Sequence, residues 1–122
     1  MNPSILVIDD DENHRLLYSR ALSQAGYDVE TASCADDALS WFRDRSFSLA
    51  VVDIEMPGLD GLELLGRLRK LSPSTALVIN SAYSTYKADF KSWVADGYVV
   101  KSSDLGPLKE KIRELLGSQD SE

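Results

Sequence analysis

Five polar residues of the sequence each stand directly after an apolar run, and their types indicate a common chemistry. They are Asp9, Asp10, Asp53, Ser81 and Lys101. Brought together, the acids would repel one another by about 4 kcal/mol for two carboxylates about 4 Å apart at an effective dielectric constant near 20. Such a cluster therefore needs a compensating positive charge, and a divalent cation is the natural one.

The available ligand atoms favour Mg²⁺ over other cations. Carboxylate oxygens supplied one at a time, with positions left open for water and phosphate, are typical of a Mg²⁺ site. A calcium site would instead be closed by more protein oxygens. Zinc prefers nitrogen and sulfur ligands, and beyond the acids the sequence offers only His14 and Cys34. The sequence therefore predicts a magnesium site.

A carboxylate surrounded by Mg²⁺, an amine and a hydroxyl is typical of phosphoryl transfer onto that carboxylate, in which the protein mainly positions groups and neutralises charge. Asp53 is the predicted acceptor because it stands alone, whereas Asp9 and Asp10 are adjacent, as metal-binding acids usually are. Lys101 would add a positive charge to this site. We expect His14 to face solvent, since the chemistry needs no second base.

The elements that must position these residues alternate regularly. Short branched apolar runs are typical of buried parallel strands, and the sequence predicts such strands over Ile5–Ile8, Tyr27–Ala32, Leu49–Val52, Ala76–Ile79 and Tyr98–Val100. Apolar residues at helical spacing predict helices over residues 12–25, 34–45, 62–71, 84–96 and 105–116.

Alternating strands and helices predict an α/β fold, a doubly wound parallel sheet of five strands with five helices. In such sheets the functional groups gather beyond the carboxyl ends of the strands. The polar residues named above follow four of the predicted strands, so we expect them to converge at one edge of the sheet.

Length, charge and composition narrow the class of protein. The 122 residues are predicted to form one domain over 1–117, with a polar tail over 118–122. The net charge of −7 disfavours direct nucleic-acid binding, which needs clustered Lys and Arg. No apolar run approaches the roughly 18–20 residues of a membrane span. The N-terminus has no leader-like segment, and a single cysteine fits a reducing compartment. We therefore expect a cytoplasmic protein.

The sequence resembles a response-regulator receiver domain of two-component phosphorelay signalling. The resemblance extends from Ile5 to Leu116 and rests on the order and spacing of four motifs, which are residues 5–10 (ILVIDD), 53–61 (DIEMPGLDG), 81–82 (SA) and 98–101 (YVVK). It implies the flavodoxin-like receiver fold with strand order 2-1-3-4-5.

The resemblance also implies a role for each acidic residue. Asp53 would accept a phosphoryl group from a sensor histidine kinase or a phosphotransfer protein. Mg²⁺ would be bound by Asp10, by Asp53 and by the backbone carbonyl of Glu55. Asp9 would hold the ion through water.

A phosphorylation-dependent switch is the function that the resemblance implies. Ser81 and Lys101 would contact the phosphoryl oxygens. Because phosphorylation adds about −1.5 to −2 charges, the Ser81 segment would be drawn inward, and Tyr98 would turn its ring inward with it. The surface formed by the last strand and its two neighbouring helices would then bind a downstream protein. The chain would act as a monomer or a weak homodimer.

The sequence departs from the family's pattern at two positions. Lys101 is followed by Ser102, where the family usually has a proline joined by a cis peptide. A non-proline cis bond costs about 2.5–4 kcal/mol, so we expect a trans bond or a strained cis bond. Ser81 stands where threonine is commoner, and it lacks the methyl group that limits rotamers. Glu55 and Tyr83 occupy positions that in the family govern water access to the acyl phosphate.

Two other functions also fit the sequence. A receiver-like interaction module that signals without phosphorylation is an alternative, and Ser81 and Ser102 leave room for it. An aspartate-nucleophile phosphatase is suggested by Asp9 and Asp11, which form an Asp-x-Asp arrangement after a strand. We expect such an enzyme to need a lid domain that a chain of this length lacks.

Overall fold

The computed structural model describes residues 2–55, 61–82 and 94–117. These residues form five strands and four helices. In chain order the elements are β1 (Ser4–Ile8), α1 (Glu12–Gln24), β2 (Asp28–Ala32), α2 (Ala35–Asp44), β3 (Leu49–Val52), α3 (Gly61–Leu71), β4 (Ala76–Ser81), β5 (Gly97–Val100) and α4 (Gly106–Leu116).

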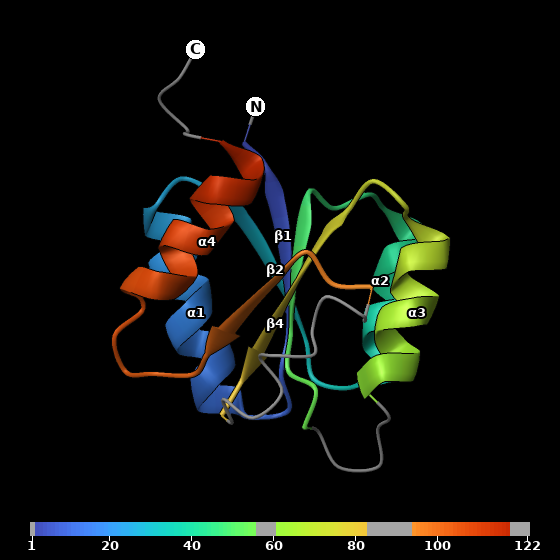
Figure 1. Cartoon of the computed structure of the whole chain (residues 1–122), viewed down its shortest axis with the longest axis horizontal. Helices are drawn as coiled ribbons and strands as arrows, with labels where there is room; N and C mark the ends of the chain where they lie inside the picture. Colours follow the sequence, from blue (N-terminus) through green and yellow to red (C-terminus); the bar gives the residue numbers. More distant parts are fainter. Residues whose placement is uncertain (1, 56–60, 83–93, 118–122) are drawn as a thin grey trace.

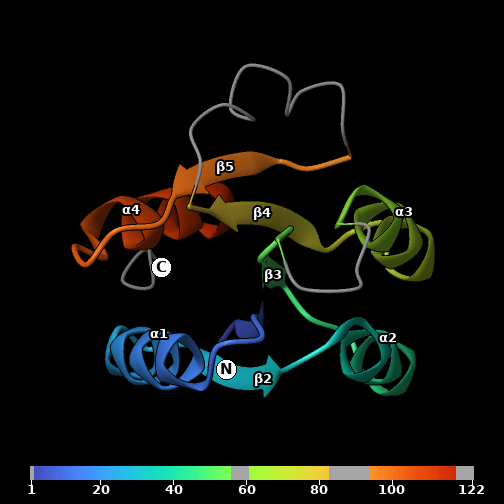
Figure 2. The ribbon, with the colours of Figure 1, turned by 90° about the horizontal axis from the view of Figure 1, so that it is seen from below.

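The strands form one parallel sheet with helices on both faces. Their order is β2-β1-β3-β4-β5, which confirms the predicted α/β topology. Helices α1 and α4 lie on one face of the sheet, and α2 and α3 lie on the other (Figures 1 and 2). Because every strand runs in the same direction, all the carboxyl ends lie at one edge of the sheet.

The core explains why the strand sequences are apolar without alternation. In β1, Ile5 and Val7 pack on the α1 and α4 side, in a cluster that includes Leu22. Leu6 and Ile8 pack on the opposite side, in the cluster that includes residues of α2 and α3. A strand covered on both faces needs apolar side chains at every position.

The predicted element boundaries differ from the observed ones at a few places. Most shift by one or two residues, which is within the variation of helix and strand ends. Strand β4 continues to Ser81, two residues beyond its predicted end, and Ser81 pairs in register with Val100. The predicted helix over 84–96 lies outside the described residues except for 94–96, which form a turn and a bend instead of a helix.

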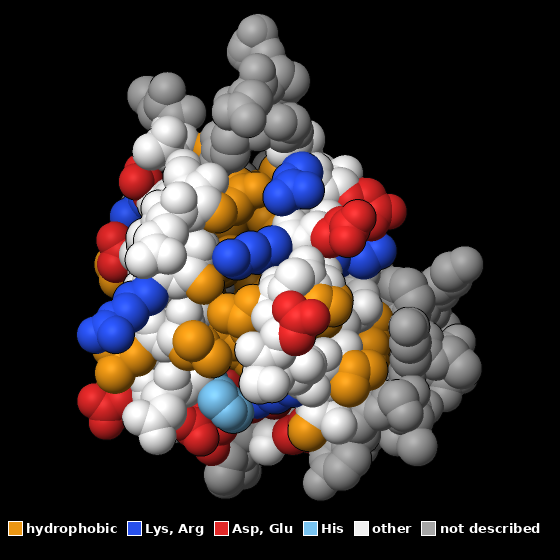
Figure 3. Space-filling model, turned by 90° about the vertical axis from the view of Figure 1, so that its left-hand side faces the viewer, with side chains coloured by type: hydrophobic (Ala, Val, Ile, Leu, Met, Phe, Trp, Pro, Cys, Tyr) orange, Lys and Arg blue, Asp and Glu red, His pale blue; other side chains and the backbone are white. Residues whose placement is uncertain are grey.

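The face formed by α1 and α4 carries charges of both signs. Figure 3 shows hydrophobic side chains along the middle of this face, with acidic and basic side chains around them. Leu16 and Leu17 of α1 are about half-exposed. The described side chains of this face therefore form no continuous basic stripe of the kind that binds nucleic acid.

None of the helices in the described residues is long and apolar enough to cross a membrane.

Gly61, the first residue of α3, is expected to be required for close packing against Ile54. A Cβ atom at Gly61 would lie 2.6 Å from the Ile54 Cβ and 2.8 Å from the Ile54 Cα. Gly61→Ala should therefore lower the free energy of unfolding by about 1–3 kcal/mol, the usual cost of overpacking, as measured by urea denaturation.

Gly66→Ala is the matched control, because nothing lies within 4 Å of an added Cβ at that helical position. It should raise the free energy of unfolding by about 0.5–1 kcal/mol, the penalty of glycine in a helix interior. Equal stabilities of the Gly61 and Gly66 variants would contradict the close approach of α3 to Ile54.

Candidate functional site

Backbone hydrogen bonds fix three predicted site residues at the carboxyl edge of the sheet. Each lies just after its strand and donates its backbone N–H to the neighbouring strand: Asp9 to Ala32 (3.1 Å), Asp53 to Ile8 (2.9 Å) and Lys101 to Ser81 (2.7 Å). These bonds continue the strand ladders by one step. The convergence that the sequence predicts for these residues is therefore a consequence of the parallel register.

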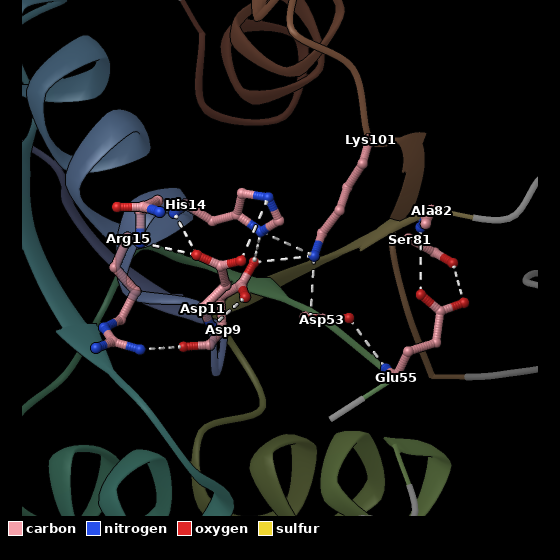
Figure 4. Close-up of polar contacts among 10 residues, drawn as sticks. Asp9, Asp11, His14, Arg15, Asp53, Glu55, Ser81, Ala82 and Lys101 are labelled. Carbon is pink, nitrogen blue, oxygen red and sulfur yellow. Dashed lines mark hydrogen bonds and ion pairs between the residues drawn. The ribbon is translucent and has the colours of Figure 1, made fainter. Parts of the chain in front are cut away.

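Lys101 lies between two buried carboxylates. Its Nζ is 3.0 Å from Asp9 Oδ2 and 3.1 Å from Asp53 Oδ2, and the two acids expose only 2% and 5% of their side chains (Figure 4). Burial lowers the pKa of Lys101, but the contacts with Asp9 and Asp53 outweigh it and leave the pKa above its ordinary value. The Lys101–Ser102 peptide bond is trans.

Asp9, Asp10 and Asp53 are placed so that they can hold a metal ion. Each offers one carboxylate oxygen, and these oxygens lie within 4.8 Å of one another. Asp9 Oδ2 is buried and has no assigned hydrogen-bond partner among the described residues, and its close cationic neighbour is Lys101 Nζ at 3.0 Å. Asp10 is exposed. A buried carboxylate oxygen beside two further carboxylates fits a hard cation such as Mg²⁺.

The turn between β1 and α1 fixes the orientation of Asp9. Asp9 Oδ1 accepts the backbone N–H of Asp11 at 2.9 Å. Asp11 in turn caps α1, because its side chain accepts the N–H groups of Asn13 (2.8 Å) and His14 (3.2 Å). The bond from the His14 N–H lowers the pKa of Asp11 below its ordinary value. Asp9 therefore has one oxygen used by the turn and one that faces the site.

The two carboxylate oxygens of Asp53 also accept hydrogen bonds from different donors. Its Oδ1 accepts the backbone N–H of Glu55 at 3.0 Å, and its Oδ2 accepts a hydrogen bond from Lys101. Asp53 is 4% exposed. The carboxylate is thus held in a fixed orientation at the end of β3.

The Glu55 side chain makes contacts that the sequence did not predict. Its Oε2 accepts a hydrogen bond from the Ser81 hydroxyl at 2.6 Å, and its Oε1 accepts one from the backbone N–H of Ala82 at 3.2 Å. Figure 4 shows this pair of bonds beside the Lys101 cluster, to which Glu55 is linked by the bond from its backbone N–H to Asp53. From the sequence, Glu55 was expected to bind the metal through its backbone carbonyl and to lie at a position that governs water access, but not to bind Ser81. No motif in the sequence signals a carboxylate that bridges β3 and β4.

Tyr98, the predicted switch residue, is buried. It is 5% exposed and belongs to the core cluster on the α2 and α3 side of the sheet. Its ring is therefore directed inward in this structure. The predicted movement of this ring stays a prediction.

His14 lies closer to the site than the sequence indicated. Its side chain is 38% exposed, and its Nδ1 lies 3.4 Å from both Asp9 Oδ2 and Lys101 Nζ. Arg15, on the same turn of α1, donates to the backbone carbonyl of Asp9 at 2.8 Å. Side chains in the first turn of a helix lean toward its N-terminus. This tilt of the first-turn side chains could have been used to predict that His14 and Arg15 lie near Asp9.

The chain was compared with known protein families and with individual proteins. The sequence model of the response regulator receiver domain matches residues 5–113. The transcriptional regulatory protein ZraR of Salmonella typhimurium is 31% identical over 114 residues, which are 92% of this chain and 26% of ZraR. The chain thus spans about a quarter of the length of this curated relative.

Two solved structures are matched over the whole of the compared chain. The response regulator protein TrrA from Thermotoga maritima in complex with Mg²⁺-BeF is 43% identical, with a TM-score of 0.87, covering 95% of this chain and all of the other. A structure of histidine kinase ThkA in complex with TrrA matches with 43% identity and a TM-score of 0.85, covering 96% of this chain and 100% of that chain.

Proposed function

Because the chain belongs to the response regulator receiver domain family, we propose that it works as a switch that is set by phosphorylation of Asp53. A receiver domain is a phosphoacceptor rather than an enzyme that turns over a substrate. The observation that carries the proposal is the placement of Lys101 Nζ between the buried carboxylates of Asp9 and Asp53. This arrangement provides a nucleophile and a fixed positive charge at one point.

The proposed step is transfer of a phosphoryl group to Asp53. A carboxylate oxygen of Asp53 attacks the phosphorus atom, a new P–O bond forms, and the P–N bond to a histidine of the donor breaks. The histidine nitrogen keeps the bonding electrons and takes up a proton. Lys101 and the Ser81 hydroxyl would stabilise the charge on the phosphoryl oxygens, which is the main contribution of a protein to this kind of reaction.

The acids of the site would hold the metal ion. Asp10, Asp53 and the Glu55 backbone carbonyl would be the direct ligands, and Asp9 would act through water. Mg²⁺ would neutralise charge on the phosphoryl group and orient it. The spacing of the three carboxylates and the burial of Asp9 Oδ2 support a metal ion at these acids.

The proposed partner is a sensor histidine kinase or a phosphotransfer protein. The complex of TrrA with the histidine kinase ThkA supports the first of these. Tyr98 would report phosphorylation to the surface that binds a downstream protein. A cytoplasmic location and a receiver domain over 1–117 stay predictions.

The test is intact-mass spectrometry after incubation with phosphoramidate and Mg²⁺. The expected result is a gain of one phosphoryl group, and removal of the metal with EDTA should prevent it, because the acids then lack the charge that offsets the incoming phosphate. Incubation with a phosphorylated histidine kinase should give the same product.

A chain that gains no phosphoryl group and also binds no beryllium fluoride would contradict this function. The alternative, an interaction module that signals without phosphorylation, would then be favoured. Steady hydrolysis of a phosphate ester that is lost in Asp9→Asn would instead favour the aspartate-nucleophile phosphatase.

A further inference from the structure

We infer that the Glu55 carboxylate competes with the phosphoryl group for the donors at the end of β4, so that Glu55 must release Ser81 when Asp53 is phosphorylated. This inference rests on the proposed function of Asp53. It assigns to the Glu55 side chain a role that is separate from metal binding by its backbone carbonyl.

The first step of the argument is the geometry of the contact. Glu55 Oε2 and Oε1 bind the Ser81 hydroxyl (2.6 Å) and the Ala82 N–H (3.2 Å), one oxygen to each donor. Two adjacent donors that bind one carboxylate form a strong anion site, since hydrogen bonds to an ionised acceptor are short and strong. The end of β4 thus already holds an anion in the unphosphorylated chain.

The second step is the position of this anion relative to Asp53. The Glu55 backbone N–H donates to Asp53 Oδ1 at 3.0 Å, so the two acids are tied to each other at the end of β3. Lys101 pairs with Asp9 and Asp53, whereas the Ser81 hydroxyl donates to Glu55 (Figure 4). The ammonium group and the hydroxyl therefore bind different anions.

The third step is that one hydroxyl proton cannot serve both anions. Ser81 has a single O–H donor, and in this structure it is donated to Glu55. A phosphoryl group on Asp53 would carry about −1.5 to −2 charges and would be repelled by an adjacent carboxylate. Contact between Ser81 and the phosphoryl oxygens therefore requires the Glu55 side chain to move away.

The test compares the wild type with Glu55→Gln and Glu55→Ala. Glu55→Gln keeps the shape and removes the charge, whereas Glu55→Ala removes the acceptor altogether. We expect the affinity for beryllium fluoride in Mg²⁺, measured by calorimetry, to rise by about tenfold in Glu55→Gln, the contribution of one charged hydrogen bond. The rise should be larger in Glu55→Ala. Phosphorylation by phosphoramidate should accelerate in the same order.

Two controls separate competition from a general charge effect. Glu30→Gln removes one negative charge from β2, where the side chain pairs with Arg45, and it should leave the affinity unchanged. In a Ser81→Ala background, Glu55→Gln should have a much smaller effect than in the wild type, because the shared donor is gone.

A measurement in EDTA examines the contact without metal or phosphate. Amide hydrogen exchange of Ala82 should be slower in the wild type than in Glu55→Ala, since its N–H has a partner only in the former. Unchanged exchange would overturn the inference.

The outcomes also distinguish this inference from the proposed function. Equal or weaker binding of beryllium fluoride by both Glu55 variants would overturn the competition and leave the function of Asp53 intact, because Glu55 would then hold Ser81 ready for the phosphoryl group. Failure of the wild type and of both variants to bind would overturn both.

Discussion

Asp53→Asn is expected to abolish phosphorylation of the chain by phosphoramidate in Mg²⁺. The amide has nearly the same shape as the carboxylate but offers no anionic oxygen to attack phosphorus. The gain of one phosphoryl group seen by intact-mass spectrometry in the wild type should fall to the level of the EDTA control. Because Asp53 lies at the end of a buried strand, circular dichroism should accompany the measurement to show that the variant is folded.

Asp44→Asn is a matched control, since Asp44 is an exposed acid at the end of α2, away from the carboxyl edge of the sheet. It should be phosphorylated like the wild type. A phosphoryl group found by peptide mapping on Asp9 or Asp10 in the Asp53 variant would show that the nucleophile had been assigned to the wrong acid. The phosphatase mechanism would then be the better interpretation.

The main features of the fold could be predicted from local patterns. Short branched apolar runs such as Ile5–Ile8 favour a strand buried on both faces, and the observed clusters on the two sides of β1 confirm this for β1. Parallel strands place all their carboxyl ends at one edge. This is why residues as distant in sequence as Asp9 and Lys101 could be expected to meet before any contact was seen.

The details of the site could not be predicted in the same way. The bond between Glu55 and Ser81 depends on the rotamer of a long side chain and on the offset between β3 and β4, neither of which leaves a periodic signal. His14 was expected in solvent because the predicted chemistry needs no second base. Its approach to Asp9 follows from the tilt of the first turn of α1. Predictions from sequence located the acids and Lys101 that meet at the carboxyl edge. They missed the partners of the Glu55 and His14 side chains.

Lys101→Met is expected to lower both the stability and the reactivity of the chain. The lysine is 14% exposed and neutralises two acids that are almost fully buried. Removing one member of a buried ion pair leaves an uncompensated charge and typically costs about 3–5 kcal/mol. The free energy of unfolding in EDTA, measured by urea denaturation, should therefore fall by about this amount.

Mg²⁺ should reduce this loss of stability. With Lys101 removed, the carboxylates of Asp9 and Asp53 lack their cation, so added Mg²⁺ should stabilise the variant more than the wild type. The difference between the two proteins in urea denaturation should be smaller in Mg²⁺ than in EDTA. Lys70→Met, at an exposed position of α3, should change stability by no more than about 0.5 kcal/mol in either condition.

Mg²⁺ should restore part of the stability of Lys101→Met but not its rate of phosphorylation. Loss of one preorganised donor to developing negative charge typically costs about 10²–10³ in rate, and Mg²⁺ cannot replace a hydrogen bond from a fixed ammonium group. Phosphorylation of Lys101→Met by phosphoramidate should therefore stay slow in saturating Mg²⁺. Lys101→Arg keeps the charge but carries a wider planar group, so it should recover stability more fully than rate. A Lys101→Met variant with wild-type stability in EDTA and wild-type rate in Mg²⁺ would show that Lys101 is an ordinary solvated lysine.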